Sequence, residues 1–119
     1  MSEYGAVIGW TGVRTGRERK AIEVWGETLA FYDKAATDGR IESVEPIGFP
    51  GGLRGLIGGL VIRGDETQIE TFVASQDFME HFARGSLVAE ELTVARCNFG
   101  SQTASTVGNY FAQLDALGL

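Results

Sequence analysis

The stretch Gly48–Gly64, GFPGGLRGLIGGLVIRG, holds seven glycines in seventeen positions and ends in an apolar run. A phosphate-binding loop requires G-x-x-x-x-G-K followed by Ser or Thr, or G-x-G-x-x-G between a strand and a helix, and neither pattern is present. The glycines are followed by Leu56–Arg63, which is typical of a central β-strand, whereas an anion site of this kind needs a helix N-terminus. The stretch is therefore predicted to be a flexible hairpin connection over 49–55 that leads into the central strand of a sheet.

Gly58 and Gly59 lie inside this predicted strand and remove side chains from both of its faces. Glycine in a strand interior weakens the strand and usually marks a bulge or the close approach of another group. That group is either a bulky side chain of the preceding helix, Trp25 or Tyr32, or a ligand. Both glycines are therefore candidate ligand-contacting positions.

Regular elements are predicted before the hairpin. Residues 5–11, GAVIGWT, alternate between two sets of apolar or small side chains, as in a strand that is buried on both faces. Thr15 with Glu18 forms a capping-box pattern, which predicts a helix that begins between them and that Gly39 closes. Residues 41–47 alternate again and contain a proline, as expected of an edge strand.

The half of the chain after the hairpin repeats this order of elements. Asp65 with Gln68 predicts a second capped helix, and Ser75 predicts a new helix start, so the helical segment is expected to break near Ala74. A fourth strand is predicted over 92–99. A C-terminal amphipathic helix follows, with apolar positions at Val107, Tyr110, Phe111, Leu114 and Leu117.

The order strand, helix, strand, strand, helix, strand predicts one α+β domain over residues 1–119, a ferredoxin-like βαββαβ antiparallel sheet with an extra C-terminal helix. Its helices are expected on one face of the sheet. The strands are nevertheless apolar on both faces, which two helices alone do not cover. A second copy is expected on the other face, giving a two-fold dimer with a barrel-like interior.

The segment Gly58–Val94, GGLVIRGDETQIETFVASQDFMEHFARGSLVAEELTV, resembles small bacterial proteins of the dimeric α+β-barrel superfamily. The similarity consists of a strand, a capped helix, the helical turn Ser-x-Asp-Phe and a return into the last strand, and it covers most of the chain up to Phe99. The resemblance implies the fold and a homodimer. That superfamily includes cofactor-free monooxygenases, haem-degrading and haem-binding proteins, isomerases and many members of unknown function.

Composition limits the partners of the protein. The 16 acidic residues outnumber the 10 basic ones, for a net charge of −6, whereas nucleic acids and anionic membranes are bound by clustered Lys and Arg. The N-terminus lacks a leader pattern, and no apolar run approaches the ~20 residues of a membrane span. With Cys97 as its single cysteine, the chain forms no internal disulfide and no multi-cysteine metal site. We expect a cytoplasmic protein without nucleic-acid or membrane partners.

His81 is the lone histidine and the only side chain with an ordinary pKa near neutrality. A metal or haem role needs partners, and the sequence offers no second histidine and no H-x-x-x-H spacing. The sequence therefore predicts no metal site and no cofactor. A solvent-facing or supporting role is favoured for His81, which stays a weak catalytic candidate.

Arg63 and Arg96 each interrupt an apolar strand, and the planar guanidinium group suits a carboxylate or enolate ligand. The favoured alternative is that Arg63 marks the exposed end of its strand and that Arg96 pairs with an acid such as Glu91 or one from a partner chain. Asn98, on the same strand face as Arg96, adds a polar donor. Arg96 and Asn98 join His81 as weak catalytic candidates.

Several aromatic residues fall at spacings that place them inside the domain, either as plain core or as the wall of a cavity for a planar organic molecule. They are Trp10, Trp25, Tyr32, Phe72 and Phe82. The predicted function is a homodimer that binds a small apolar organic ligand between sheet and helices, with Trp10, Trp25, Gly58, Gly59, Arg63 and Arg96 as candidate ligand-binding residues. The resemblance implies an alternative, a cofactor-independent monooxygenase or isomerase that acts on an aromatic or polyketide-like compound. A third alternative is a protein-interaction module whose C-terminal helix exchanges between subunits.

Overall fold

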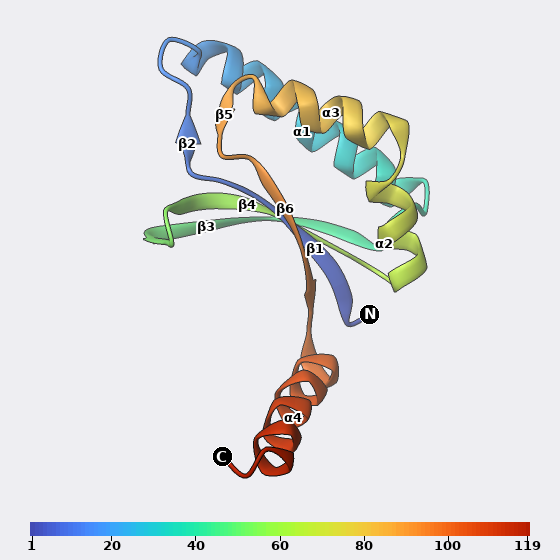
Figure 1. Ribbon diagram of the computed structural model, residues 1–119. Coiled ribbons are helices and arrows are strands. Elements are labelled where there is room, and N and C mark those ends of the chain that lie inside the picture. The colour runs from blue at the N-terminus through green and yellow to red at the C-terminus, as the bar shows by residue number, and fades with distance from the viewer.

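A four-stranded antiparallel sheet, in the order β3-β4-β1-β6, carries three helices on one face in the computed structural model, which describes residues 1–119 (Figure 1). The strands of the sheet are β1 (Tyr4–Trp10), β3 (Ser43–Leu53), β4 (Leu56–Gly64) and β6 (Thr93–Asn98). The helices are α1 (Glu18–Thr37), α2 (Glu66–Val73), α3 (Gln76–Ser86) and α4 (Gly100–Ala116). A small second sheet joins β2 (Gly12–Val13) to β5 (Ala89–Glu90). The predicted α+β, ferredoxin-like order of elements is confirmed, and the β2–β5 pair is an addition that the sequence did not predict.

The helix signals in the second half of the chain are confirmed. Asp65 accepts a hydrogen bond from the backbone N–H of Gln68, whose side chain accepts from the backbone N–H of Asp65, which completes the capping box of α2. Ser75 caps α3, and the two helices are separated near Ala74 as predicted. Gly39 follows α1 in the left-handed conformation, with φ of 79°.

The predicted cap of α1 is wrong. The helix begins at Glu18, and Thr15 makes no capping hydrogen bond to it. Instead, the Glu18 carboxylate accepts from the backbone N–H of Gly16 at 3.1 Å. The difference arises because Gly16, with φ of 84°, turns the chain between the hydroxyl of Thr15 and the first helical N–H groups.

The glycine-rich stretch is more regular than predicted. β3 runs to Leu53, so residues 49–53 belong to a long hairpin rather than to a flexible connection, with a register irregularity between Gly48 and Leu53. The turn is made by Arg54 and Gly55, whose φ values of 51° and 85° are both positive, as in the tight turns that suit twisted strands. β3 is an edge strand, as predicted, and an edge position tolerates its prolines.

The core lies between the sheet and the helices. Ala6 and Ile8 of β1 and Leu60 and Ile62 of β4 point to this side and are at most 4% exposed. Side chains of α1, α2 and α3 pack onto them, chiefly Tyr32, Ala35, Ile69, Phe72 and Phe78. Alternation along the two central strands therefore places one set of apolar residues under the helices.

The opposite set of strand residues faces away from α1, α2 and α3. Val7 pairs in register with Val61 on β4 and with Ala95 on β6, and Cys97 follows on the same face. None of these side chains belongs to the buried core. We call this surface of the sheet the open face. The expectation that both faces are apolar is met only in part, because Ser43, Glu45 and Arg63 share the open face with these apolar residues. The helices α1, α2 and α3 cover only the other face (Figure 1).

Helix α4 extends away from the sheet on the side opposite to α1 and α3 (Figure 1). None of its residues is buried. Its projection contributes to an elongated molecule of 54 × 33 × 23 Å. No helix of the structure has both the length and the apolar composition needed to cross a membrane.

The backbone contact at Gly59 gives a test of the fold. A Cβ atom at this position would run into the carbonyl oxygen of Ile8 and lie 3.1 Å from the Cα of Gly9, both of which are backbone atoms of the neighbouring strand. Gly59→Ala is expected to lower the free energy of unfolding by about 3 kcal/mol, at the upper end of overpacking penalties. Chemical denaturation followed by circular dichroism measures the change.

Gly48→Ala is the matched control, because it lies in the same hairpin with no atom within 4 Å of its added Cβ. It is expected to change stability by less than about 0.5 kcal/mol. Equal stabilities for the two variants at the same protein concentration would contradict the close approach of β1 and β4.

Candidate functional site

A cavity of about 250 Å³ lies between the sheet and helices α1 and α3, at the end of the sheet where the β2–β5 pair begins. The sheet supplies Ile8, Trp10 and Leu60 to its wall, and α1 supplies Trp25, Thr28 and Tyr32 together with smaller side chains. The remaining wall residues from α3 onward are His81, Phe82, Gly85, Val88, Ala89 and Leu92. The lining is therefore mostly apolar, with a few polar groups, as in sites for small organic molecules.

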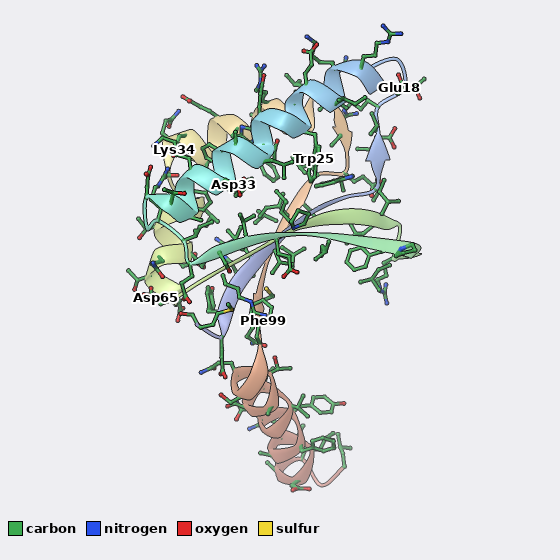
Figure 2. The ribbon with its side chains drawn as sticks, turned by 180° about the vertical axis from the view of Figure 1, so that it is seen from behind. Glu18, Trp25, Asp33, Lys34, Asp65 and Phe99 are labelled. Atoms are coloured by element: carbon green, nitrogen blue, oxygen red, sulfur yellow. The ribbon has the colours of Figure 1, made fainter.

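Two tryptophans form one wall of the cavity. Trp25 points from α1 toward the sheet (Figure 2), where its ring centroid lies 5.3 Å from that of Trp10 at an interplanar angle of 71°. This edge-to-face arrangement is a favoured geometry for aromatic pairs. Trp10 is placed by β1, in register with Gly58, and a Cβ on Gly58 would lie 3.9 Å from the indole of Trp10. This is an ordinary van der Waals distance. The closest neighbour of such a Cβ is the carbonyl oxygen of Ile47, at 3.1 Å, so the backbone of β3 approaches Gly58 where the sequence predicted a side chain of α1 or a ligand.

His81 and Thr28 provide a hydrogen-bonded pair in the wall. The Thr28 hydroxyl lies 2.7 Å from the carbonyl oxygen of Val24 and 2.8 Å from Nε2 of His81. A hydroxyl has a single proton and a carbonyl oxygen only accepts, so Thr28 donates to Val24 and accepts from His81. Nε2 of His81 therefore carries the proton, and Nδ1 is the basic atom of the neutral ring.

The surroundings of His81 favour its neutral form. Its ring stacks on Phe31 with a centroid distance of 4.7 Å and an interplanar angle of 7°. Burial lowers the pKa of His81, and the Arg84 guanidinium lowers this pKa as well. The Glu27 carboxylate acts in the opposite direction, but it is ion-paired with Arg84 at 2.6 Å. The imidazole is therefore uncharged at neutral pH.

The structure brings one part of the predicted set of residues together. Trp10, Trp25, Tyr32, Phe82 and His81 all line the cavity. Phe72, by contrast, is plain core at 1% exposure. Gly58 stands behind Trp10, and Gly59 lies on the face of the sheet that points away from the cavity.

Arg96 lies outside the cavity, in an ion pair with Glu70 of α2. Its guanidinium donates to both carboxylate oxygens, at 2.6 and 3.0 Å, and the Tyr4 hydroxyl donates to the same carboxylate at 2.7 Å. These donors lower the pKa of Glu70 to about 2. The acid suggested by sequence proximity, Glu91, is not the partner. The ion pair of Arg96 therefore links the edge strand β6 to α2.

Arg63 and Asn98 also lie apart from the cavity. The Arg63 guanidinium sits 3.6 Å from the ring centroid of Phe99, a cation–π contact on the open face. The Asn98 side chain accepts from the Thr103 hydroxyl at 2.9 Å and donates to the Thr106 hydroxyl at 3.4 Å. The three weak catalytic candidates are thus separated, since Arg96 and Asn98 do not meet His81 at one site.

Thr28 and the β2–β5 pair were not predicted as parts of the site. Trp25, Thr28 and Tyr32 follow one another at spacings of three and four on α1, so a polar residue inside this apolar stripe was the available signal for Thr28. Val13 and Ala89 come from two-residue strands, which are too short to show a periodic pattern. No group of three or more His, Cys, Asp and Glu side chains is placed to hold a metal ion.

The fold and this cavity define an α+β protein of ferredoxin-like fold with an apolar site between its sheet and helices. No protein-family model matches the chain, and no curated protein matches its sequence. A dimeric protein of unknown function and ferredoxin-like fold from Bacteroides fragilis matches in structure with a TM-score of 0.61 and 9% identity, over 83% of this chain and 98% of that chain. A conserved protein of unknown function from Bacteroides thetaiotaomicron, described as a possible oxidoreductase, matches with a TM-score of 0.58 and 13% identity, over 83% of this chain and 100% of that chain. At these identities the likeness shows the fold alone.

The burial of neutral His81 predicts a pH-dependent stability. Because its pKa is lower in the folded than in the unfolded protein, the unfolded chain binds more protons as the pH falls through the ordinary histidine value of 6.5. Stability is therefore complete above pH 7 and declines as the pH falls below 6.5. The midpoint of thermal unfolding is expected to drop by a few degrees between pH 7.5 and pH 5.5.

His81→Gln is the comparison variant, because glutamine keeps an N–H donor for Thr28 and does not titrate. It is expected to lose most of the change over this interval, measured by differential scanning fluorimetry in matched buffers. An identical pH profile in the variant would show that His81 is not the responsible group.

Proposed function

We propose that this protein is a homodimer that binds a small, planar, mostly apolar organic molecule in the cavity between its sheet and helices. The observation that carries the proposal is the cavity wall itself, a mostly apolar lining that contains the Trp10–Trp25 pair and the hydrogen-bonded pair of His81 and Thr28. Sites for drug-sized ligands occupy about 300–1,000 Å³. The volume of about 250 Å³ fits a compound of one or two rings.

The polar groups limit the chemistry of the ligand. Nδ1 of neutral His81 is an acceptor, so a ligand hydroxyl or N–H that reaches the ring is a suitable partner. Glu18 belongs to the lining, and hydrogen bonds to its carboxylate from its own backbone N–H and from that of Gly16 hold its pKa below the ordinary value. A phenol or a similar neutral aromatic therefore suits the cavity better than an anionic compound.

The open face supports the homodimer. Val7, Val61 and Ala95 form an apolar strip across three strands that no helix of the chain covers. A two-fold pair of identical sheets buries such a strip on both chains at once. The Bacteroides fragilis protein of similar fold is dimeric, which supports the same arrangement here.

Replacing either of two alanines of α1 with phenylalanine tests ligand binding. Ala21 lines the cavity and Ala30 is exposed on the same helix. A panel of small aromatics, 1-naphthol, indole and catechol, is titrated into the protein, and isothermal titration calorimetry measures the dissociation constant of each. Ala21→Phe fills the cavity and is expected to weaken binding of the best probe at least ~10-fold, the loss that steric exclusion from a small apolar site produces.

Ala30→Phe adds the same side chain outside the cavity and is expected to bind like the wild type. Arg96→Ala is expected to bind like the wild type as well, because Arg96 is engaged with Glu70 away from the cavity. Binding that survives Ala21→Phe, or the absence of binding for every probe, would count against the cavity as the site.

An enzymatic role is the second candidate, favoured by the presence of one neutral imidazole in the cavity wall. Nδ1 of His81 is suited to accept a proton from an acidic C–H or O–H of a bound aromatic or polyketide-like compound. Such a step serves an isomerisation, and it also precedes reaction with dioxygen in a cofactor-independent oxygenation. The possible oxidoreductase from Bacteroides thetaiotaomicron shares the fold and is consistent with this candidate.

Isotope exchange separates binding from catalysis. A compound that binds is incubated with the protein in deuterium oxide, and exchange of its acidic C–H is followed by nuclear magnetic resonance. If His81 is the base, His81→Gln is expected to reduce the exchange rate at least ~100-fold, the usual contribution of a general base, while binding persists. Exchange at the background rate with the wild-type protein would leave a binding protein and eliminate the enzyme.

A further inference from the structure

Helix α4 carries a row of apolar side chains, none of which is buried by its own chain. Val107, Tyr110, Phe111, Leu114 and Leu117 recur at the three- and four-residue spacing of one helical face. Tyr110 is 65% exposed, Phe111 is 58% exposed and Leu117 is 71% exposed. We call this row of side chains the α4 ridge.

The composition of α4 gives the helix little stability of its own. Its 17 residues include two glycines and a run of serine, threonine and asparagine, which all rank low in helix propensity. Helices of this length are marginal in water even when their propensity is high, and most helical stability in proteins comes from packing of an apolar face. Helix α4 therefore needs a surface on which to pack the α4 ridge.

The base of α4 is held firmly. The Glu3 carboxylate accepts hydrogen bonds from the Ser101 hydroxyl and from the backbone N–H of Gln102, at the N-terminus of the helix. The Asn98 side chain bridges Thr103 and Thr106 on the first turns. These bonds fix the direction of α4 away from the sheet, so the α4 ridge does not pack on the sheet of its own chain.

The charge of α4 excludes two kinds of partner. Asp115 is the only charged residue in the helix. Helices that lie on membrane surfaces carry Lys and Arg on their polar face, and segments that bind nucleic acid do the same. The absence of basic side chains leaves a protein surface as the partner.

We propose that the α4 ridge docks on a second copy of this chain, so that the C-terminal helix of each subunit packs against the other subunit. We call α4 in this role the arm. The inference rests on the homodimer proposed above. Helix α4 projects from the end of β6 on the side of the open face, with Phe99 at the junction (Figures 1 and 2). A copy seated on the open face therefore lies beside α4, and in the proposed dimer one two-fold operation covers both the open face and the α4 ridge.

The area of the ridge agrees with this assignment. A large aromatic side chain buries about 150–250 Å² when covered, so the partly exposed ridge offers on the order of 500 Å² per arm. Two arms and the surfaces they cover bring the total to on the order of 2,000 Å², compared with about 1,200–2,000 Å² in stable protein interfaces. The arms alone are thus large enough to hold a dimer together.

Charge substitutions on two faces of α4 test the proposal. In Tyr110→Glu with Phe111→Glu, two carboxylates enter the ridge, whereas Ser105→Glu with Asn109→Glu adds the same charge to the opposite face of the same helix. Light scattering after gel filtration is expected to show that the wild type and the control variant are dimers. The dimer dissociation constant of the ridge variant is expected to rise at least ~100-fold, as for the loss of central aromatic contacts. Reaction of Cys97, the only thiol, with Ellman's reagent is expected to become faster in the ridge variant, because Cys97 lies on the open face.

A photo-crosslink tests the contact in a protein close to the native one. Benzoylphenylalanine in place of Phe111 is expected to give a covalent product of twice the 12.8 kDa chain mass, and benzoylphenylalanine in place of Asn109 is expected to give little. Crosslinking at Phe111 supports the proposal even where the charged variant fails to fold.

The outcomes separate this inference from the proposed function. A wild-type monomer would overturn both the homodimer and the docking of the arm, and a different protein would then be the partner of the α4 ridge. A ridge variant that stays as dimeric as the control, with no crosslink at Phe111, overturns the arm and leaves the homodimer standing. Failure of every aromatic probe to bind, with an intact ridge-dependent dimer, removes ligand binding and leaves the arm.

Discussion

The side-chain alternation along β1 and β4 is the constraint on which the rest of the structure depends. Because successive residues of a strand point to opposite faces, Ala6 and Ile8 lie under the helices while Val7 lies on the open face. The face under α1, α2 and α3 is apolar, whereas the uncovered open face carries an apolar strip flanked by Glu45 and Arg63. The cavity is the part of the covered face where the packing is incomplete, and the open face is the part of the fold that the chain leaves without a cover.

The two regions of interest are set apart by the same sheet. On the covered face, the tryptophan pair and neutral His81 enclose a space next to the β2–β5 pair, far from the charged edge at Glu70 and Arg96. On the other side, α4 projects away from the sheet, opposite to α1 and α3. The proposed ligand and the proposed second subunit therefore use different faces of the sheet, so the proposed dimer does not need to close the cavity.

Some features of the fold followed from local chemistry and were predictable. The capping box of Asp65 and Gln68, the Ser75 cap and the left-handed Gly39 each depend on residues within a few positions of one another, and each was confirmed. Thr15 failed as a cap because the conformation of Gly16 redirects the chain. The hairpin of Gly48–Gly64 was expected to be loose, yet pairing with β4 extends β3 as far as Leu53.

The sequence by itself determined the order of the main elements, the alternation of residues between the two sheet faces and the amphipathic pattern of α4, because periodicity and caps are local properties. Only the tertiary structure decided that Trp10, Trp25, Thr28 and His81 share one cavity, and that Arg96 pairs with Glu70, 26 residues away. It also decided that backbone carbonyl oxygens of the neighbouring strands, those of Ile47 and Ile8, lie closest to Gly58 and Gly59, where the sequence predicted a side chain of α1 or a ligand. These contacts join elements that are distant in the chain, and their distances depend on how the helices cross the twisted sheet, which no local pattern encodes.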